Sequence, residues 1–369
     1  NWISGIGLLD NLRLGKQSKI ASEAEDNKGR NKYYLLPFLL GILGMVFHYK
    51  NGKNNFIVTM MLFLFTGILL MVFLNQPPFE PRERDYASVG SFQTFCIWVG
   101  LGVIGLASFV KKYLDAKVAG IAAIALSLFA VPVLMANQNW DDHDRSERYL
   151  GIDFANNYLM SCAPNAILLC NGDNDTYPLW YAQNVEGIRT DVRIINMALL
   201  PTDWYSGALL SDVYESKKLP LTITMEQLKS AKTDVIRYAN NTRLNQTVYQ
   251  PLDKIIEILL SDKPETFFPG TKEKYLPFKK FKIKIDKEAV KRNGVVMEKD
   301  FDKIVDEILI DYPNNYMTKG ELVLFDFIAQ NAKNGWERPI YFTSTTGSSS
   351  YLNLQSYFQQ EGLVHRFVP

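Results

Sequence analysis

The sequence predicts a multi-pass α-helical membrane region with four spans, followed by a soluble α/β domain with a partly parallel sheet. Three observations predict this fold class. Four long apolar runs without Asp, Glu, Lys or Arg fill the first third of the chain. The formal net charge of the whole chain is only +1. After residue 137 the pattern changes to short apolar strands alternating with helices.

Each apolar run approaches the ~20 residues that a helix needs to cross ~30 Å of hydrocarbon. Buried helices of a large soluble core are the alternative, but such helices carry a polar stripe, which these runs lack. We therefore expect an external pre-membrane segment at 1–32, a membrane region at 33–136 and an extracytoplasmic domain at 137–369. The four predicted spans are 33–49, 56–74, 92–110 and 118–136.

Lysines are concentrated in two short loops between the predicted spans. The loops 50–55 and 111–117 together hold five lysines against one acid, Asp115. The positive-inside rule makes these loops cytoplasmic and places the soluble domain outside, in the periplasm of a bacterium with two membranes. The six Lys and Arg residues in 1–32 oppose this topology, because that segment would also lie outside.

The composition excludes some classes of function. A near-neutral chain lacks the basic face that nucleic-acid binding requires. The three cysteines show no metal-ligand spacing, so we predict no metal site, and the residues identify no cofactor.

No predicted span carries a charge, which disfavours a transporter. Because the chain begins with Asn1, we expect an internal fragment of a longer protein.

The first half of the α/β domain follows a strand–helix–strand pattern. The apolar run 166–170 predicts a strand, and 192–199 predicts the next one. Between them, Pro178 in a first turn and Gly187 as a stop indicate a helix over 176–186. Two strands joined by so short a crossover helix are expected to be parallel neighbours.

The rest of the domain is predicted in less detail. Residues 203–317 form an irregular insertion, in which we expect a helix at 224–240 and an exposed edge strand at 280–285. A capping box of Thr318 and Glu321 opens the next helix. A buried strand at 339–343, in one sheet with the first two, and a final helix at 351–361 complete the prediction.

The first candidate site is the proline-rich loop 75–86 between the second and third spans. It holds Arg82, Arg84 and Asp85 at a membrane surface. The planar fork of arginine suits phosphate, so a lipid-linked phosphate is one ligand for this loop. An equally weighted alternative is a purely structural network of arginines and carboxylates.

The second candidate site follows the fourth span directly and consists of Asp141, Asp142, His143, Asp144 and Arg145. Carboxylates and an imidazole can bind a divalent ion or act as a general base. A charged run that leaves a membrane helix is more often a solvated interface or a helix cap. Residue types alone fix no geometry, so the sequence leaves both roles open.

The third candidate site is the turn 171–175, which follows a predicted strand and contains Asn171, Asp173 and Asp175. Open α/β sheets bind ligands at the carboxyl ends of their strands. The Asp-x-Asp pattern also resembles the one with which nucleotide-sugar transferases hold a metal and a diphosphate. Helix capping and turn formation are the more common roles of such residues. A serine- and threonine-rich loop at 343–350 also follows a strand, and we expect it to be flexible.

Four strings in the sequence resemble a bacterial family of large multi-pass membrane proteins. That family was long labelled only by a domain of unknown function, and it is related to the transmembrane protein O-mannosyltransferases of the C-type glycosyltransferase superfamily. The resemblance runs from the first residues to the last. The strings that carry it are NQPPFEPRERDYASVGSF, QNWDDHDRSERY, NGDNDTYPLWYAQNVEGIRTDVRIIN and NGWERPIYF.

The resemblance implies a membrane glycosyltransferase. Such an enzyme would transfer a sugar from a polyprenyl-phosphate donor to Ser or Thr of an exported protein, at the outer face of the bacterial inner membrane. The superfamily's usual catalytic acid lies in a first external loop, which we expect to lie upstream of this chain. No residue of this chain is therefore predicted to be catalytic. The alternative is a non-enzymatic scaffold, anchored in the membrane, whose external domain binds an envelope protein. Fold alone does not separate these functions.

Overall fold

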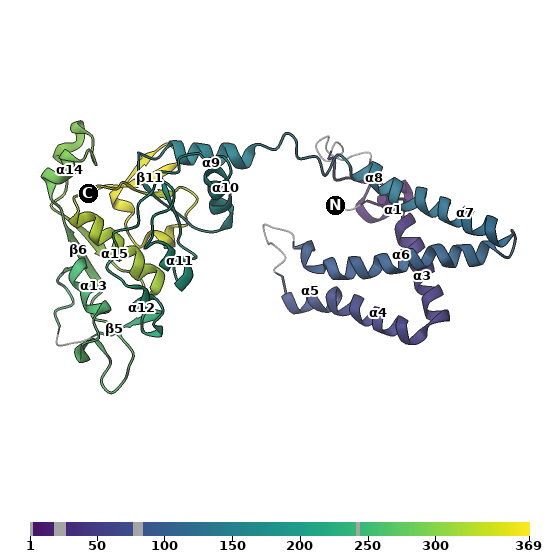
Figure 1. Cartoon of the computed structure of the whole chain (residues 1–369), viewed down its shortest axis with the longest axis horizontal. Helices are drawn as coiled ribbons and strands as arrows, with labels where there is room; N and C mark the ends of the chain where they lie inside the picture. Colours follow the sequence, from purple (N-terminus) through teal and green to yellow (C-terminus); the bar gives the residue numbers. More distant parts are fainter. Residues whose placement is uncertain (1–2, 18–26, 77–83, 241–243) are drawn as a thin grey trace. The chain divides into compact units, whose positions relative to one another are not determined.

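The chain folds into two compact units, Asn1–Glu147 and Arg148–Pro369 (Figure 1). A computed structural model describes residues 3–17, 27–76, 84–240 and 244–369. The first unit contains helices and no strand among its described residues. The second unit contains all the described strands, together with the helices that cover them.

Apolar helices dominate the first unit, which we call the membrane unit. In chain order its helical segments are α1 (Gly7–Leu14), α3 (Leu36–Asn51), α4 (Lys53–Thr66), α5 (Ile68–Leu74), η2 (Asp85–Ser88), α6 (Val89–Val110), α7 (Ala116–Leu128), η3 (Phe129–Val133) and α8 (Leu134–Asn139). The η3 segment is a π-helical turn that contains Pro132. Proline removes a backbone donor, which accounts for the local widening between α7 and α8.

Three helices of the membrane unit are long and apolar enough to cross a membrane, not the four predicted. Among the described residues these are Lys53–Leu74, Asp85–Val110 and Ala116–Asn139. They coincide with the second, third and fourth predicted spans. The first predicted span, 33–49, is wrong by this criterion, because α3 has only 16 residues. At 1.5 Å per residue, α3 is about 24 Å long, which is shorter than ~30 Å of hydrocarbon.

Helix α3 packs tightly against α6 through glycines. A Cβ atom added to Gly44 would collide with the carbonyl oxygen of Trp98, and one added to Gly102 would collide with that of Leu40. Small residues allow helix backbones to approach closely in apolar bundles. Because of this contact, α3 belongs to the membrane unit even though it is short.

The second unit, which we call the α/β unit, is built around a five-stranded mixed sheet. Its strand order is β10-β11-β9-β1-β2. Strand β1 pairs in parallel with β2 on one side and with β9 on the other. Strand β11 is antiparallel to both β9 and β10. The strands are β1 (Ile167–Cys170), β2 (Arg193–Asn196), β9 (Ile340–Thr343), β10 (Phe358–Glu361) and β11 (Val364–Phe367).

These pairings confirm that 166–170, 192–199 and 339–343 contribute to one sheet, with the first two parallel. Every residue of β1, β2 and β9 is buried, as expected when helices cover both faces of parallel strands. Helices α9 (Leu150–Met160) and α10 (Asp173–Asn184) supply side chains to the apolar cluster on one face. A larger cluster, which includes α15 (Lys319–Lys333), covers the other face.

Two helix predictions in the first and last parts of the α/β unit need correction. Helix α10 begins at Asp173, three residues before the predicted start at Thr176, because Gly172 has a φ of 98° and ends the preceding turn. The final helix predicted over 351–361 is wrong. That segment holds short 3-10 turns and strand β10, and Gly362, with a φ of 58°, turns the chain into β11.

The middle of the α/β unit contains two further three-stranded sheets, of order β5-β3-β8 and β4-β6-β7. The predicted helix at 224–240 is wrong, since a capping box of Thr224 and Gln227 opens only a one-turn helix before a strand. The predicted edge strand at 280–285 lies in the centre of its sheet. The capping box of Thr318 and Glu321 is confirmed.

The remaining elements of this region are short. They are α11 (Asp203–Ala208), α12 (Met225–Leu228), η4 (Ala231–Thr233), β3 (Val235–Tyr238), β4 (Gln250–Pro251), α13 (Leu252–Leu260), η5 (Pro264–Thr266), β5 (Tyr275–Leu276), β6 (Lys280–Lys284), α14 (Lys287–Arg292), η6 (Glu298–Lys303), β7 (Glu307–Asp311), β8 (Tyr316–Thr318), η7 (Ser348–Tyr351) and η8 (Gln355–Tyr357).

Candidate functional site

The first predicted site lies only partly within the described structure. Arg82 lies outside the described residues. Arg84 is the residue immediately before η2, and Asp85 is the first residue of that turn. Both are exposed. These positions do not test phosphate recognition by the loop, which stays a prediction.

In the second predicted site, Asp142 is the residue most closely tied to the fold. Its Oδ2 accepts a hydrogen bond of 2.5 Å from Asn31 Nδ2. Its Oδ1 is buried, and no described residue bonds to it. Asn31 also donates to Asn139 Oδ1 at 2.8 Å, and Tyr33 donates to the same oxygen at 2.5 Å. This network joins the segment before α3 to the end of α8.

The other residues of the second site are exposed and make local contacts. His143 Nδ1 lies 2.8 Å from the carbonyl oxygen of Asn139. Asp144 accepts hydrogen bonds from the backbone and the side chain of Ser146. Asp141 and Arg145 are exposed. The described residues contain no group of three or more His, Cys, Asp or Glu that could hold a metal ion.

A cleft at the same end of the membrane unit was not predicted from the sequence. It is open, encloses about 730 Å³ and is formed by the segment before α3 and the end of α8. Two cations, Lys28 and Arg30, line it together with Trp140 and Asp141. Arg84 does not line it. The full lining consists of Asn27, Lys28, Arg30, Asn31, Ala136, Asn137, Gln138, Trp140 and Asp141.

This cleft combines the features that suit an anionic lipid head group. It lies where a long apolar helix ends, and Trp140 is 81% exposed beside it. Tryptophan favours the level of the lipid head groups, and Lys and Arg side chains bind phosphate. The signal in the sequence was the cationic run Lys28, Arg30 and Lys32, which is part of the charged segment 1–32 that opposes the predicted topology.

The third predicted site lies at the carboxyl edge of the parallel strands, as expected. Asp175 is 5% exposed, and it accepts hydrogen bonds from the hydroxyls of Thr343, at 3.1 Å, and Thr345. Asn171 Nδ2 donates to Ser350 Oγ at 3.1 Å. The turn after β1 is therefore bonded to the loop after the neighbouring strand β9.

These contacts give Asp175 a structural role, because both of its threonine donors belong to the 343–350 loop. The 343–350 loop, which was expected to be flexible, is therefore held by hydrogen bonds. A further hydrogen bond of 2.9 Å joins the Tyr158 hydroxyl to Ser344 Oγ. Asp173 is exposed at the first turn of α10. A role of Asn171 and Asp173 in binding a ligand stays a prediction.

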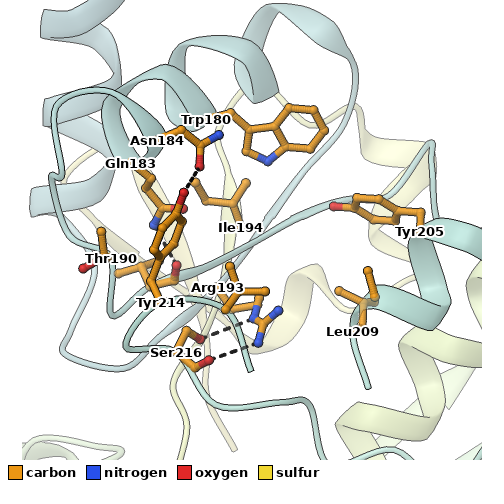
Figure 2. A pocket seen from close by; sticks show the side chains of 13 residues that line it. Trp180, Gln183, Asn184, Thr190, Arg193, Ile194, Tyr205, Leu209, Tyr214 and Ser216 are labelled. Atoms are coloured by element: carbon orange, nitrogen blue, oxygen red, sulfur yellow. Dashed lines mark hydrogen bonds between the residues drawn. The ribbon is translucent and has the colours of Figure 1, made fainter. Parts of the chain in front are cut away.

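A pocket of about 170 Å³ lies beside strand β2, and the sequence analysis missed it (Figure 2). Aromatic side chains from three segments form its walls, namely Trp180, Tyr205 and Tyr214. Tyr214 donates a hydrogen bond of 2.7 Å to Asn184 Oδ1. The full lining is Trp180, Gln183, Asn184, Thr190, Val192, Arg193, Ile194, Tyr205, Ala208, Leu209, Val213, Tyr214 and Ser216.

Arg193, on strand β2, is the charged residue of this pocket, and it is only 5% exposed. Its Nη2 donates to the carbonyl oxygens of Ser211, Ser216 and Lys217 at 2.9, 3.1 and 2.9 Å. Arg338, which is also buried, donates to Lys217 O and Ser216 Oγ. No described carboxylate forms an ion pair with Arg193 or Arg338 within 4.0 Å.

Burial lowers the pKa of the Arg193 guanidinium. Burial, assisted by the charge of Arg193, lowers the pKa of Arg338 to about 10. Both groups keep their charge at neutral pH, and backbone carbonyls hold them in place of carboxylates. A single arginine within the otherwise apolar run 192–199 was the available signal for this site.

Residues 151–369 match the family model described as TMEM260-associated domain 2. A "Protein O-mannosyl-transferase tmem260" from Dictyostelium discoideum is 25% identical over 205 residues, which cover 49% of this chain and 24% of that protein. The chain thus spans about a quarter of the length of this curated relative. No solved structure matches the chain. These matches confirm the predicted link to O-mannosyltransferase-like proteins, whereas the bacterial source and the C-type superfamily stay predictions.

Proposed function

The chain belongs to the family of the TMEM260-associated domain 2, and on this premise we propose that it is part of a membrane glycosyltransferase. The proposed enzyme transfers a sugar, mannose in the first instance, from a polyprenyl-phosphate carrier to Ser or Thr of an exported protein. The name of the Dictyostelium relative, a protein O-mannosyl-transferase, supports the reaction class. The three apolar helices support a membrane location.

The observation that carries the lipid-phosphate part of the proposal is the cleft lined by Lys28, Arg30 and Trp140. In the transfer, the bond between the anomeric carbon and the phosphate oxygen breaks, and a new bond forms to the hydroxyl oxygen of the acceptor. The hydroxyl proton passes to a base, and the polyprenyl phosphate leaves with an additional negative charge. Cations placed in advance at that phosphate stabilise the charge as it develops.

We assign Lys28 and Arg30 to the phosphate, with Arg82 and Arg84 as further candidates on the 75–86 loop. Asp141 lines the same cleft, and it is placed to contact the sugar or a cation. No described residue is assigned as the base. The resemblance to the C-type superfamily attributes that role to an acid in a first external loop, and no residue of this chain has been matched to it.

The proposed location is the inner membrane of a bacterium, with the α/β unit in the periplasm. The lysines of 50–55 and 111–117 motivate this topology. In intact cells that lack Cys96, an impermeant thiol reagent should label Glu215→Cys in the α/β unit and leave Asn54→Cys unlabelled. Labelling of Asn54→Cys would reverse the topology.

The transfer assay uses membranes that contain the protein, polyprenyl-phosphate mannose as the donor and a Ser/Thr peptide as the acceptor. A Lys28→Ala, Arg30→Ala double variant removes two charge-assisted contacts, each worth ~1.5–3 kcal/mol. We expect transfer per folded molecule to fall at least roughly tenfold. The matched control is Lys217→Ala, Lys218→Ala, which removes two exposed cations of the α/β unit and none of the lysines on which the topology rests.

Normal transfer by a stable Lys28→Ala, Arg30→Ala variant would exclude the cleft as the phosphate site. A folded wild-type protein that transfers no sugar from any polyprenyl-phosphate donor would favour the scaffold function instead.

A further inference from the structure

Strand β2 forms one edge of the five-stranded sheet, and none of the described strands pairs with its outer side. The amide of Arg193 donates to Ala166 O, and the amide of Met197 donates to Cys170 O, both at 2.8 Å. Because successive residues of a strand point their backbone groups to opposite sides, the N–H and C=O groups of Ile194 point away from β1.

Two side chains of the protein already bond to outward backbone groups of β2 on either side of Ile194. The amide of Asn196 donates to the Tyr205 hydroxyl at 2.7 Å. The carbonyl oxygen of Val192 accepts a hydrogen bond of 2.8 Å from Gln183 Nε2. For the outward N–H and C=O of Ile194, the described part of the chain supplies no partner. Ile194 is only 6% exposed, and buried backbone groups are rarely left unpaired.

The pocket of Figure 2 opens beside this unpaired residue. Its volume of about 170 Å³ is close to that of an apolar cavity of ~150 Å³ that holds a benzene-sized group. The pocket therefore fits one apolar side chain. Trp180 and Tyr205 form walls for such a side chain, with ring centroids 6.5 Å apart.

Arg193 adds a charge preference on the other face of the strand. Its Nε and Nη2 are bonded to the 211–217 segment, but no described residue accepts a hydrogen bond from Nη1. A guanidinium that keeps donors for a further acceptor, and on which Asp212 acts only from beyond 4.0 Å, favours an acidic group from outside the chain.

We propose that the β2 edge binds an extended polypeptide segment that carries an acidic residue. An antiparallel strand satisfies both backbone groups of Ile194 with a single residue of its own. That residue places its side chain on the α10 face, at the pocket, and a neighbouring Glu or Asp faces Arg193. The proposal rests on the proposed function only in taking this segment to be the acceptor protein; peptide binding itself is independent of sugar transfer.

The binding test uses the full chain in lipid nanodiscs and a heptapeptide blocked at both ends. The peptide has a central Val, a Glu before it, Thr residues around them and terminal Lys residues for solubility. We expect measurable binding by calorimetry and slower hydrogen exchange of the segment 192–197. Methylation of the Val amide nitrogen should weaken binding roughly tenfold, and replacement of the Glu by Gln by a similar factor.

Two protein variants test the same contact from the other side. Ile194→Pro removes the outward-facing N–H, a change that edge strands tolerate, and it also replaces the buried Ile194 side chain and restricts φ. Ile194→Val keeps the N–H and is the matched control. We expect roughly tenfold weaker binding to Ile194→Pro and unchanged binding to Ile194→Val. If Ile194→Pro does not fold, the N-methylated peptide still tests the backbone pairing on the wild-type protein.

Absence of peptide binding, or binding that N-methylation does not weaken, would overturn the proposal. Slower exchange of 192–197 with methyl α-mannoside, in place of the peptide, would assign the pocket to a sugar and also overturn it. Peptide binding without any sugar transfer would contradict the proposed function alone. Transfer that Ile194→Pro leaves unchanged would overturn the identification of the bound segment with the acceptor protein.

Discussion

The membrane unit exposes large apolar side chains, whereas the α/β unit buries them. In the membrane unit, large apolar side chains point outward: Phe65 on α4 is 59% exposed and Phe73 on α5 is 84% exposed. Its helix contacts use small residues such as Gly41 and Gly44. In the α/β unit, Phe325, Phe327 and other large side chains are fully buried.

This difference identifies the solvent of each unit. Water drives large apolar side chains inward, whereas hydrocarbon is as apolar as those side chains and exerts no such force. Helices in hydrocarbon are held together by close backbone packing. The membrane unit therefore matches a lipid environment and the α/β unit an aqueous one.

The largest expected effect is the difference in stability between two Phe→Ala variants, one in each unit. Phe325→Ala empties a site in the α/β unit between Phe281 and Tyr312, and it should cost about 3–5 kcal/mol of folding free energy. Phe73→Ala removes an outward side chain of α5, and it should change the stability little. Thermal unfolding of both variants in detergent, followed by far-UV circular dichroism, measures the contrast. Equal losses of stability would contradict the assignment of different solvents.

A smaller effect is expected from the glycine contacts of the membrane unit. Gly44→Leu places a side chain against the backbone of α6, and it should cost about 1–3 kcal/mol or prevent the packing of α3. Gly100→Leu is the matched control, since no heavy atom lies within 4 Å of a Cβ added there. Proteolysis and the melting temperature report the change. A harmless Gly44→Leu would show that α3 does not pack on α6 as described.

The smallest effect concerns a polar anchor of the α/β unit. Two hydrogen bonds from Arg189, of 2.8 and 3.0 Å, lower the pKa of the Asp191 carboxyl below its ordinary value of 3.8. The folded state therefore favours the ionised carboxylate. Its stabilising contribution is present above pH 3.8, the value expected in the unfolded chain, and is lost as the pH falls through the lowered pKa.

We expect Asp191→Asn to cost ~1 kcal/mol at neutral pH and progressively less as the pH falls below 3.8. Urea denaturation of the two proteins across this pH range measures the difference. A difference that does not change with pH would assign the effect to packing and not to charge.

How much of the fold the sequence predicts differs between the two units. Uncharged runs located the three long helices, because the length of an apolar run is a direct physical requirement of spanning. The contact of Gly44 with Trp98 depends on how two helices cross, which no local pattern specifies. In the α/β unit, buried strands and the capping box of Thr318 were predicted, since each is a local signal. The segment 351–361, which contains β10, was predicted to be a helix, because it has no strict alternation and the strand that β10 pairs with lies outside it.

The sites were less predictable than the fold. The position of the 171–175 turn at the sheet edge followed from strand order. The burial of Asp175 depends on Thr343 and Thr345, which are far away in the sequence. The β2 pocket is lined by segments between Trp180 and Ser216. Its two distinguishing features are the N–H and C=O of Ile194, which no described residue bonds, and the guanidinium of Arg193, which no described carboxylate pairs with. Both features depend on the three-dimensional structure, and no local pattern predicts them.

The central claim, that the outward apolar side chains of the first unit face lipid, can be measured with spin labels in vesicles. The labels are attached at Phe73→Cys in the membrane unit and at Tyr214→Cys in the α/β unit, with Cys96 replaced by Ser. We predict that relaxation of the Phe73→Cys label responds strongly to oxygen and weakly to a water-soluble nickel complex, and that the Tyr214→Cys label shows the reverse. A strong response of the Phe73→Cys label to the nickel complex would contradict the account.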